Sequence, residues 1–245
     1  MRRFELLGVD GLPEVRPGDD LGELICARAS FERGDVLVVA QKIVSKSEGR
    51  LVDLETVTAG PRAVEIASRL IAAPDPRMVQ VVLDESVRVV RSDRVLITET
   101  RHGYVCANGG VDHSNVGGTD MLSLLPVDPD ASAVRLRSRI RDLVGVDVGV
   151  IVSDTFGRPW RVGIVNVALG VAGLPAAIDL RGSLDDAGRP LHATVLAISD
   201  DLASAAGVVM GKTERTPAVI VRGLQLEGAG TGRELIRPAA EDLFR

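Results

Sequence analysis

Two continuous apolar runs constrain the fold of this 245-residue chain more than any other feature of its sequence. They cover residues 35–40 (DVLVVA) and 146–153 (VDVGVIVS). Short runs of this kind are typical of strands that are buried on both faces of a sheet, because a strand with one solvated face alternates apolar and polar residues. We therefore expect both segments to be buried strands, and the polar residues that follow them to face a ligand or a solvated loop.

Helix and strand signals alternate along the rest of the chain. Asp19 or Asp20 is placed to cap a helix that begins at Leu21, and Pro61 suits the first turn of a second helix. Apolar spacing predicts helices over 61–73, 132–144 and 200–210, and strands over 78–83, 86–98 and 217–223. The small apolar run 162–173 (VGIVNVALGVAG) predicts a tightly packed buried helix or a strand–helix unit. The arginines 135, 137, 139 and 141 are expected to form a solvated helix face.

The size and charge of the chain exclude several classes of protein function. The length suits one large domain or two small interlocked ones. The net charge is −5 and no basic cluster is present, which argues against a nucleic-acid surface, since nothing would neutralise a run of phosphates. No window reaches the roughly 18 apolar residues of a membrane span, and no signal peptide is recognisable at the start. We therefore expect a cytoplasmic protein that binds neither membrane nor nucleic acid.

Rare polar residue types gather in the segment from Gly103 to Val116 (GYVCANGGVDHSNV). Within fourteen residues it holds the only tyrosine, one of two cysteines, one of three histidines and two of three asparagines. Carboxylate, amide, imidazole and hydroxyl groups beside two glycines are the composition of an anion or metal site, because glycine lets the backbone approach a ligand. The alternative interpretation is an Asn/Gly-rich hairpin turn.

Lysine is scarce in this chain, which has 29 basic residues and only three lysines, Lys42, Lys46 and Lys212. A lysine ammonium is a compact point charge suited to phosphate oxygens, and it is not interchangeable with an arginine fork there. The three lysines are therefore candidates for phosphate binding. Residues 206–213 also match a loose P-loop pattern, but a helix is predicted before them and a strand after them, which reverses the order that a P-loop requires.

Two acids lie close to a hydroxyl or amide residue, one in the segment 103–116 and one directly after the apolar run 146–153. Asp112 precedes Asn115, and Asp154 is followed directly by Thr155. Such hard oxygen donors suit Mg²⁺ or Mn²⁺ that keep water and phosphate as further ligands. The three histidines fit no zinc spacing, and no GxSxG elbow of a serine hydrolase occurs. Lysines and acids together indicate a nucleoside triphosphate that is bound through divalent metal ions.

Several collinear segments resemble the coenzyme F420-0:L-glutamate ligase family, the GTP-dependent enzymes that add γ-linked glutamates to a deazaflavin coenzyme. The segments are GLPEV, QKIVSKSEGR, CANGGVDHSNV, VSDTFGRPWR followed by GxxNVALGVAG, DLRG, and MGKTERTPAVIVRG. The likeness spans nearly the whole chain, so that residues 1–245 would form one ligase domain. The chain resembles the stand-alone form, without the nitroreductase-like domain of some bacterial relatives.

The resemblance implies a mixed α/β (α+β) fold with two lobes and an intertwined homodimer. It implies two divalent ions, Mg²⁺ or Mn²⁺, with K⁺ in some members, and the substrates GTP, L-glutamate and coenzyme F420-0. Matched motifs place the metal on Asp112, Asp154 and Thr155, with the two acids as the catalytic residues. The residues matched to GTP contacts are Gly11, Leu12, Pro13, Glu14, Gln41, Lys46, Asn115, Met210, Gly211 and Lys212.

The implied reaction passes the γ-phosphate of GTP to the coenzyme's carboxylate, and the glutamate amine then attacks the acyl phosphate. One motif departs from the family pattern, which has Ala-Asp-Glu-Leu-Ala where this chain has SDDLA at residues 199–203. A role for the acids Asp200 and Asp201 is therefore not carried over. Two alternatives remain, a metal-dependent phosphotransferase that acts on another carboxylate and a non-catalytic nucleotide-binding subunit.

Overall fold

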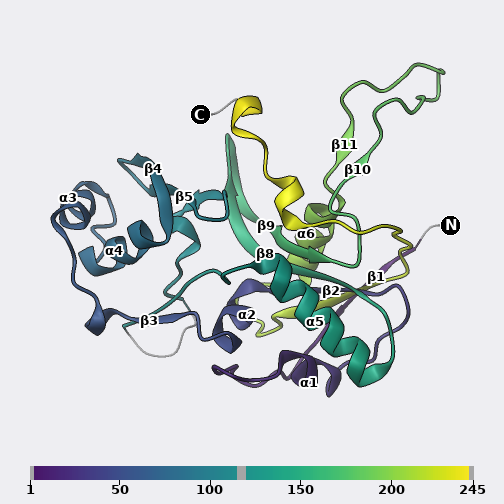
Figure 1. Cartoon of the computed structure of the whole chain (residues 1–245), viewed down its shortest axis with the longest axis horizontal. Coiled ribbons are helices and arrows are strands. Elements are labelled where there is room, and N and C mark those ends of the chain that lie inside the picture. The colour runs from purple at the N-terminus through teal and green to yellow at the C-terminus, as the bar shows by residue number, and fades with distance from the viewer. Residues whose placement is uncertain (1–2, 115–119, 243–245) are drawn as a thin grey trace.

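The computed structural model describes residues 3–114 and 120–242, and shows a mixed α/β chain with several sheets (Figure 1). The largest sheet has the strand order β1-β12-β2-β8-β9. Its strands are β1 (Glu5–Gly8), β12 (Ala218–Arg222), β2 (Val36–Ala40), β8 (Gly149–Arg158) and β9 (Arg161–Ala172). Strands β2 and β8 are parallel, and the other neighbouring pairs are antiparallel. The two apolar runs of the sequence thus lie side by side at the centre of this sheet.

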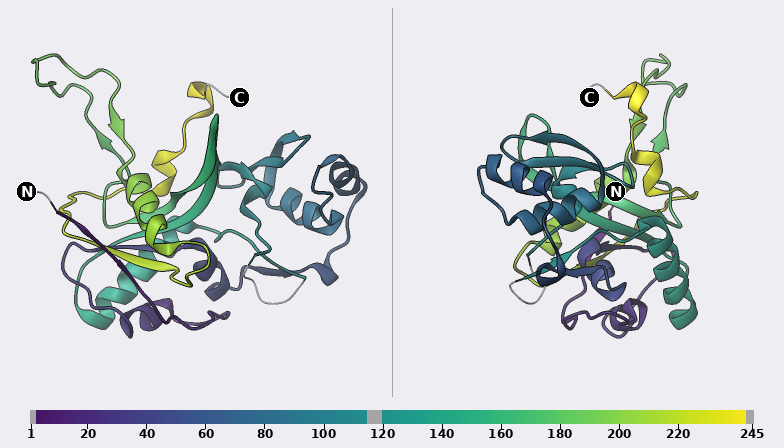
Figure 2. Two further views of the ribbon diagram at one scale, coloured as in Figure 1. Left: turned by 180° about the vertical axis from the view of Figure 1, so that it is seen from behind. Right: turned by 60° about the vertical axis from the view of Figure 1, so that its left-hand side comes forward.

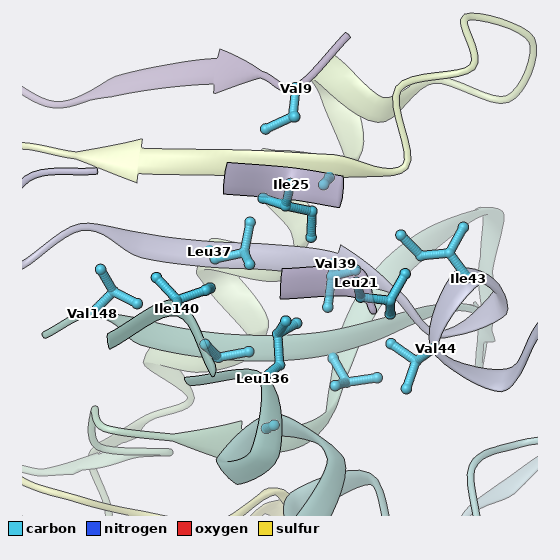
Figure 3. Packing of buried hydrophobic residues seen from close by; sticks show 14 of the residues in the cluster. Val9, Leu21, Ile25, Leu37, Val39, Ile43, Val44, Leu136, Ile140 and Val148 are labelled. Carbon is cyan, nitrogen blue, oxygen red and sulfur yellow. The ribbon is translucent and has the colours of Figure 1, made fainter. Parts of the chain in front are cut away.

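Helices cover both faces of the large sheet. One face packs on α1 (Leu21–Cys26), α2 (Gln41–Ser47) and α5 (Pro129–Val144), through side chains that include Leu37, Val39 and Val150 (Figure 3). The opposite face packs on α6 (Ile198–Met210), through Val38, Ile151 and neighbours. Alternate residues of each strand therefore enter different clusters, as the pleat requires. Burial on both faces explains why these strands have unbroken apolar sequences.

Residues 51–125 form a separate set of elements that lies to one side of the large sheet (Figure 1). They pack around their own apolar cluster, which includes Ile66, Val82, Leu96 and Leu122. Two small sheets frame it, with the orders β4-β5-β6 and β3-β7. The elements are β3 (Leu51–Asp53), η1 (Leu54–Thr56), α3 (Pro61–Arg69), α4 (Pro76–Asp84), β4 (Ser86–Ser92), β5 (Leu96–Thr100), β6 (Val105–Ala107), η2 (Asn108–Gly110) and β7 (Met121–Ser123).

Two segments project from the body of the molecule (Figure 2). One is the ribbon of β10 (Ile178–Asp179) and β11 (Val195–Leu196), which carries the long loop between them. The other is the tip of the hairpin between β8 and β9. The chain then ends in the short helices η3 (Gly232–Leu235) and η4 (Ala239–Glu241). Among the described helices, none combines the length and the apolar content that a membrane span would need.

Most of the predicted elements are confirmed. The runs 35–40 and 146–153 fall on β2 and β8, although β8 begins at Gly149 and continues to Arg158. Helix α1 begins at Leu21, and the side chain of Asp20 accepts a hydrogen bond from the Glu23 N–H as its N-cap. Helices α5 and α6 and strand β12 match the predicted segments 132–144, 200–210 and 217–223, and α3 ends four residues earlier than predicted.

Two local predictions are wrong, and a third holds only in part. Residues 78–83 belong to helix α4 and not to a strand, because Asp75 caps the helix and Pro76 starts it. Residues 162–172 belong to strand β9 and form neither a helix nor a strand–helix unit, since the long pairing with β8 satisfies their backbone groups. The solvated arginine face of α5 is confirmed for Arg135 and Arg141, which are exposed, whereas Arg137 and Arg139 are half-buried. Arg135, Arg137 and Arg139 form ion pairs with Glu48, Asp147 and Asp20.

Candidate functional site

The predicted site lies where the parallel strands β2 and β8 end together. Ala40, the last residue of β2, pairs with Ser153, and β2 passes directly into helix α2. Strand β8 continues beyond this point, so that Asp154 and Thr155 are the first residues without a partner on β2. In the alternation of β8, Asp154 shares the face of Val150 and Val152, on the side of α2. Thr155 shares the face of Ile151, on the side of α6.

Asp112 reaches this place from the separate segment 51–125. Its backbone forms an isolated antiparallel bridge with Ser123, with N–O distances of 3.0 and 2.8 Å. Two glycines precede it with positive φ values, Gly109 at 57° and Gly110 at 72°, a conformation that favours glycine. The tight turn of this segment is therefore confirmed and leads directly into Asp112, while the site interpretation stays a prediction.

The carboxylate of Asp112 already has a cationic partner. The Lys42 ammonium donates to Asp112 Oδ2 at 2.5 Å and to the carbonyl oxygen of Ser114 at 2.6 Å. The Ser114 N–H and hydroxyl also donate to this carboxylate, at 2.8 and 2.9 Å. Burial acts to raise the pKa of Asp112, but these bonds outweigh it, and the pKa lies below its ordinary value. Asp112 is therefore ionised and held in a fixed orientation.

Asp154 has the opposite electrostatic environment. Burial raises the pKa of Asp154 from its ordinary 3.8 to about 6, and the nearby carboxylate of Asp112 adds to the rise. The Thr155 N–H, Lys212 and Lys42 oppose this rise. The pKa values of the two acids therefore move apart, as expected where two carboxylates share a site. A cation between them would relieve their repulsion.

Thr155 lies at the centre of a small polar group on the side of α6. The Lys212 ammonium donates to Thr155 Oγ1 at 2.6 Å, and this hydroxyl donates to Asn166 Oδ1 at 3.2 Å. Asn166 is opposite Thr155 in the pairing of β8 with β9, and its amide nitrogen lies 3.5 Å from the sulfur of Met210. Both Lys42 and Lys212 thus contact groups that were predicted to hold metal.

The residues predicted to contact GTP lie on three neighbouring segments. The buried Lys46 on α2 forms an ion pair with Glu14, which joins α2 to the loop that contains Gly11, Leu12 and Pro13. Gln41 is buried on α2 and accepts a hydrogen bond from Ser45 at 2.9 Å. Thr216 donates to Asp10 at 2.8 Å, which links the same loop to the turn at Met210, Gly211 and Lys212. Asn115 lies outside the described residues.

The donor atoms at this site fit a hard cation. Among the described residues, no group of three or more histidine, cysteine, aspartate and glutamate side chains converges as a metal cage. What the strand ends offer is two carboxylates and one hydroxyl, from Asp112, Asp154 and Thr155. Mg²⁺ and Mn²⁺ are commonly bound by one or two carboxylates with water and phosphate as the remaining ligands. The residues therefore suit a metal that arrives with an anionic substrate.

Two residues at the site were not among the predicted site residues. Lys42 was one of three phosphate-binding candidates, yet its contact with Asp112, 70 positions away, has no local sequence signal. Asn166 is a single amide within an apolar run, and this isolation is the signal that could have drawn attention to it. An amide in a strand that otherwise packs apolar side chains needs a polar partner.

Comparison with known proteins gives a consistent result. A family model described as F420-0:Gamma-glutamyl ligase matches residues 11–223. A coenzyme F420:L-glutamate ligase of Methanopyrus kandleri is 50% identical over 239 residues, which cover 95% of this chain and 94% of the relative. A protein of the same name from Methanocaldococcus jannaschii is 45% identical over 100% of this chain and 98% of its own length. The one from Archaeoglobus fulgidus is 44% identical over 99% of this chain and 97% of its own length.

Proposed function

The chain belongs to the F420-0:gamma-glutamyl ligase family, and from that premise we propose that it is a GTP-dependent ligase. The proposed reaction adds L-glutamate, through a γ-linkage, to coenzyme F420-0 or to F420. The observation that carries the proposal is the approach of Asp112 and Asp154, which lie 42 positions apart in sequence, with two lysines beside them. Carboxylates paired with lysines suit metal ions and the phosphates that these ions accompany.

The metal site of the proposal consists of Asp112, Asp154 and Thr155. Two divalent ions, Mg²⁺ or Mn²⁺, would bind there, and K⁺ is a further candidate ion. When bound, such ions offset the negative charge of the phosphates and of the phosphoryl group in transfer. The lysines that now occupy these oxygens would turn to the phosphates instead. Support for this exchange comes from Lys42 on Asp112 and Lys212 on Thr155.

The GTP site of the proposal takes in the loop Gly11–Glu14, Gln41, Lys46, Asn115 and the turn Met210–Lys212. Its support is the adjacency of the described segments around the end of β2, through the Lys46–Glu14 ion pair and the Thr216–Asp10 hydrogen bond. A buried lysine whose partner is a largely exposed glutamate can exchange that partner for a phosphate, because both are anionic. Lys46 is the residue that we assign to this role.

The reaction has two steps in this proposal. A carboxylate oxygen of the coenzyme attacks the γ-phosphorus of GTP, GDP leaves, and an acyl phosphate is formed. The amine of glutamate then attacks the acyl carbon, inorganic phosphate leaves, and the amine proton is released. The chain's contribution is mainly to position the reactants and to compensate charge, as is usual in phosphoryl transfer.

The assembly is also part of the proposal. We assign residues 1–245 to one ligase domain with two lobes, in an intertwined homodimer in the cytoplasm. Two observations support the dimer. The tip of the β8–β9 hairpin exposes Val162 completely and Ile164 to 57%, and the projecting ribbon of β10 and β11 exposes Val195 and Leu196. Exposed apolar groups on projecting segments are typical of surfaces that another chain covers.

The experiment that tests the function measures GDP release from GTP in the presence of Mn²⁺. We expect release that needs both glutamate and coenzyme F420-0, and a product that is heavier by glutamate units in its mass spectrum. Sustained GDP release without glutamate, beyond a single turnover, would identify a phosphotransferase instead. Binding of GTP without any release would identify a non-catalytic subunit.

The variant Asp154→Ala tests whether the reaction takes place at this site. We expect it to abolish turnover while circular dichroism stays that of the native chain, because it removes a carboxylate and no apolar packing. Asp142→Ala, which removes an exposed acid of α5, is the matched control and should retain full activity. Full activity of Asp154→Ala would overturn the metal assignment.

A further inference from the structure

Strand β9 contains an irregularity next to the proposed metal site. Val152 pairs with Gly170, but the next residue of β8, Ser153, pairs with Ala168. Leu169 is therefore an extra residue on β9, which is a β-bulge. The directions of the neighbouring side chains confirm the shift. Asn166, Ala168 and Val171 all face α6, although strict alternation would place Ala168 and Val171 on opposite faces. One extra residue therefore lies between them.

The bulge decides which residue stands opposite Thr155. With it, Thr155 pairs with Asn166. Regular pairing continued from Val152 and Gly170 would instead set Val167 opposite Thr155, because each step along β8 is one step back along β9. Opposed residues of an antiparallel pair point to the same face, and a slip of one residue moves every side chain to the other face. Without the bulge, Thr155 would lose its amide partner to a valine.

Side chains from two different parts of the fold hold the bulge in place. Strand β9 is at the edge of the large sheet, so its outward backbone groups have no neighbouring strand in the part of the chain that the structure describes. Asp200 of α6 accepts a hydrogen bond from the Ala168 N–H at 2.8 Å. The Tyr104 hydroxyl, from the loop before β6, donates to the Leu169 carbonyl oxygen at 2.5 Å. These two bonds fix the bulge residue and the residue before it.

The chemistry of both groups suits this task. Tyr104 is buried, and burial raises its pKa above the ordinary value, so that the hydroxyl stays a donor at neutral pH. Burial likewise raises the pKa of Asp200, while the bond from Ala168 opposes the rise. Asp201, the next residue, is exposed and makes no such bond to β9. The two adjacent acids of α6 thus have different roles.

We propose that Asp200 and Tyr104 are positioning residues for the metal site, which act by holding the Leu169 bulge and thereby keep Asn166 against Thr155. This inference rests on the proposed function, because it concerns a residue of the proposed metal site. The hydrogen bonds of both side chains described above go to the backbone of β9 and not to the proposed metal ligands. Groups that orient a metal ligand typically change metal affinity by roughly 10- to 100-fold when they are removed.

The test compares Asp200→Ala, Asp200→Asn and Asp201→Ala in the full-length chain. Mn²⁺ affinity is measured by electron paramagnetic resonance, and thermal stability is measured in metal-free buffer. We expect Asp200→Ala to weaken Mn²⁺ binding by about tenfold or more. Asp200→Asn, whose amide oxygen still accepts from Ala168, should restore nearly the native affinity. Asp201→Ala should leave it unchanged.

Tyr104→Phe tests the second bond and removes a single hydroxyl from a packed ring, so it remains informative if Asp200→Ala does not fold. We expect weaker Mn²⁺ binding in this variant as well. Two outcomes would overturn the inference, even if all variants were less stable. One is native Mn²⁺ affinity in both Asp200→Ala and Tyr104→Phe. The other is that Asp200→Ala and Asp200→Asn weaken Mn²⁺ binding equally.

Hydrogen–deuterium exchange separates this inference from the proposed function. If the native chain bound no Mn²⁺, the proposed metal site would fail, but the role of the bulge could still be judged. Peptides that cover residues 153–168 should exchange faster in Asp200→Ala and in Tyr104→Phe than in the native chain. Unchanged exchange in both would overturn the positioning role.

Discussion

Asp154 shows at the scale of a single residue how a prospective metal ligand affects stability. Its pKa of about 6 exceeds the ordinary 3.8 because burial and Asp112 disfavour the charged form. The native state therefore binds more protons than the unfolded chain between these two values. The contribution of Asp154 to the free energy of unfolding therefore falls as the pH rises from 3.8 to about 6, and it has fallen completely above about pH 6.

We predict that Asp154→Asn stabilises the metal-free protein above about pH 6, by roughly 2–3 kcal/mol, since one pKa unit corresponds to about 1.4 kcal/mol. The gain should shrink as the pH falls and vanish below about pH 3, where the aspartate is protonated in both the native and the unfolded state. Urea unfolding at a series of pH values, with a chelator present, measures it. The exposed Asp142→Asn should show no such trend, and a pH-independent gain for Asp154→Asn would contradict the electrostatic explanation.

The types of the site residues could be predicted from sequence, but several of their partners could not. The sequence singled out Asp154 because it follows a predicted strand, Lys46 because lysine is scarce, and Asp112 because it lies beside two glycines. The contact of Lys42 with Asp112 depends on how residues 51–125 pack, and that packing has no local signal. The position of Asn166 opposite Thr155 depends on a one-residue bulge, which a residue pattern does not reveal.

At the scale of elements, the close packing of β9 against α5 fixes the same hairpin from its other end. A β-carbon added to Gly170 would lie 2.1 Å from the Pro129 carbonyl oxygen, which belongs to the first turn of α5. The carboxylate of Asp130 in that turn also accepts from the Val171 N–H at 2.8 Å. The helix start therefore touches the backbone of β9, and only glycine leaves room for it.

We predict that Gly170→Ala destabilises the protein by about 1–3 kcal/mol, because backbone must move to accept the methyl group. Gly157→Ala, in the same hairpin, has no atom within 4 Å of the added carbon and should change stability by less than about 0.5 kcal/mol. Thermal unfolding of both variants measures the difference. Equal stability of the two would mean that α5 and β9 separate easily.

Helices and strands were predicted correctly from sequence where both faces of the element are buried. The prediction failed where the structure of a segment depends on residues that lie outside it in the sequence. The runs at β2 and β8 are apolar because both faces are covered, and that is a local signal. Residues 162–173 were misassigned because small residues, including Gly170, are required by the approach of α5, and this approach is not encoded within the run itself. Residues 78–83 are rich in valine, yet Asp75 and Pro76 start a helix there.

For the whole molecule, the exposed hairpin tip gives the proposed dimer a direct test. Val162 and Ile164 are exposed at the hairpin tip, and neither belongs to the apolar cluster that packs on α6. We predict that the double change Val162→Glu and Ile164→Glu converts a dimer into monomers in analytical ultracentrifugation, because charges replace apolar groups in the contact. Ile71→Glu alters a residue that is 70% exposed after α3, and should leave the dimer intact.

Two results would contradict this prediction. A native chain that sediments as a monomer at all accessible concentrations would exclude the dimer itself. A doubly substituted chain that remains dimeric would place the contact elsewhere on the surface.

Asp112 and Asp154 belong to parts of the chain that pack around different apolar clusters. Their spacing is therefore maintained by docking, through the Lys42 bridge and the cluster of Tyr104, Cys106, Leu125 and Leu169, and not by chain connectivity. Proteins open in such units at free energies below that of complete unfolding. If residues 51–125 detach in this way, the two acids separate while the five-stranded sheet stays intact, and we expect warming to abolish Mn²⁺ binding before the sheet unfolds.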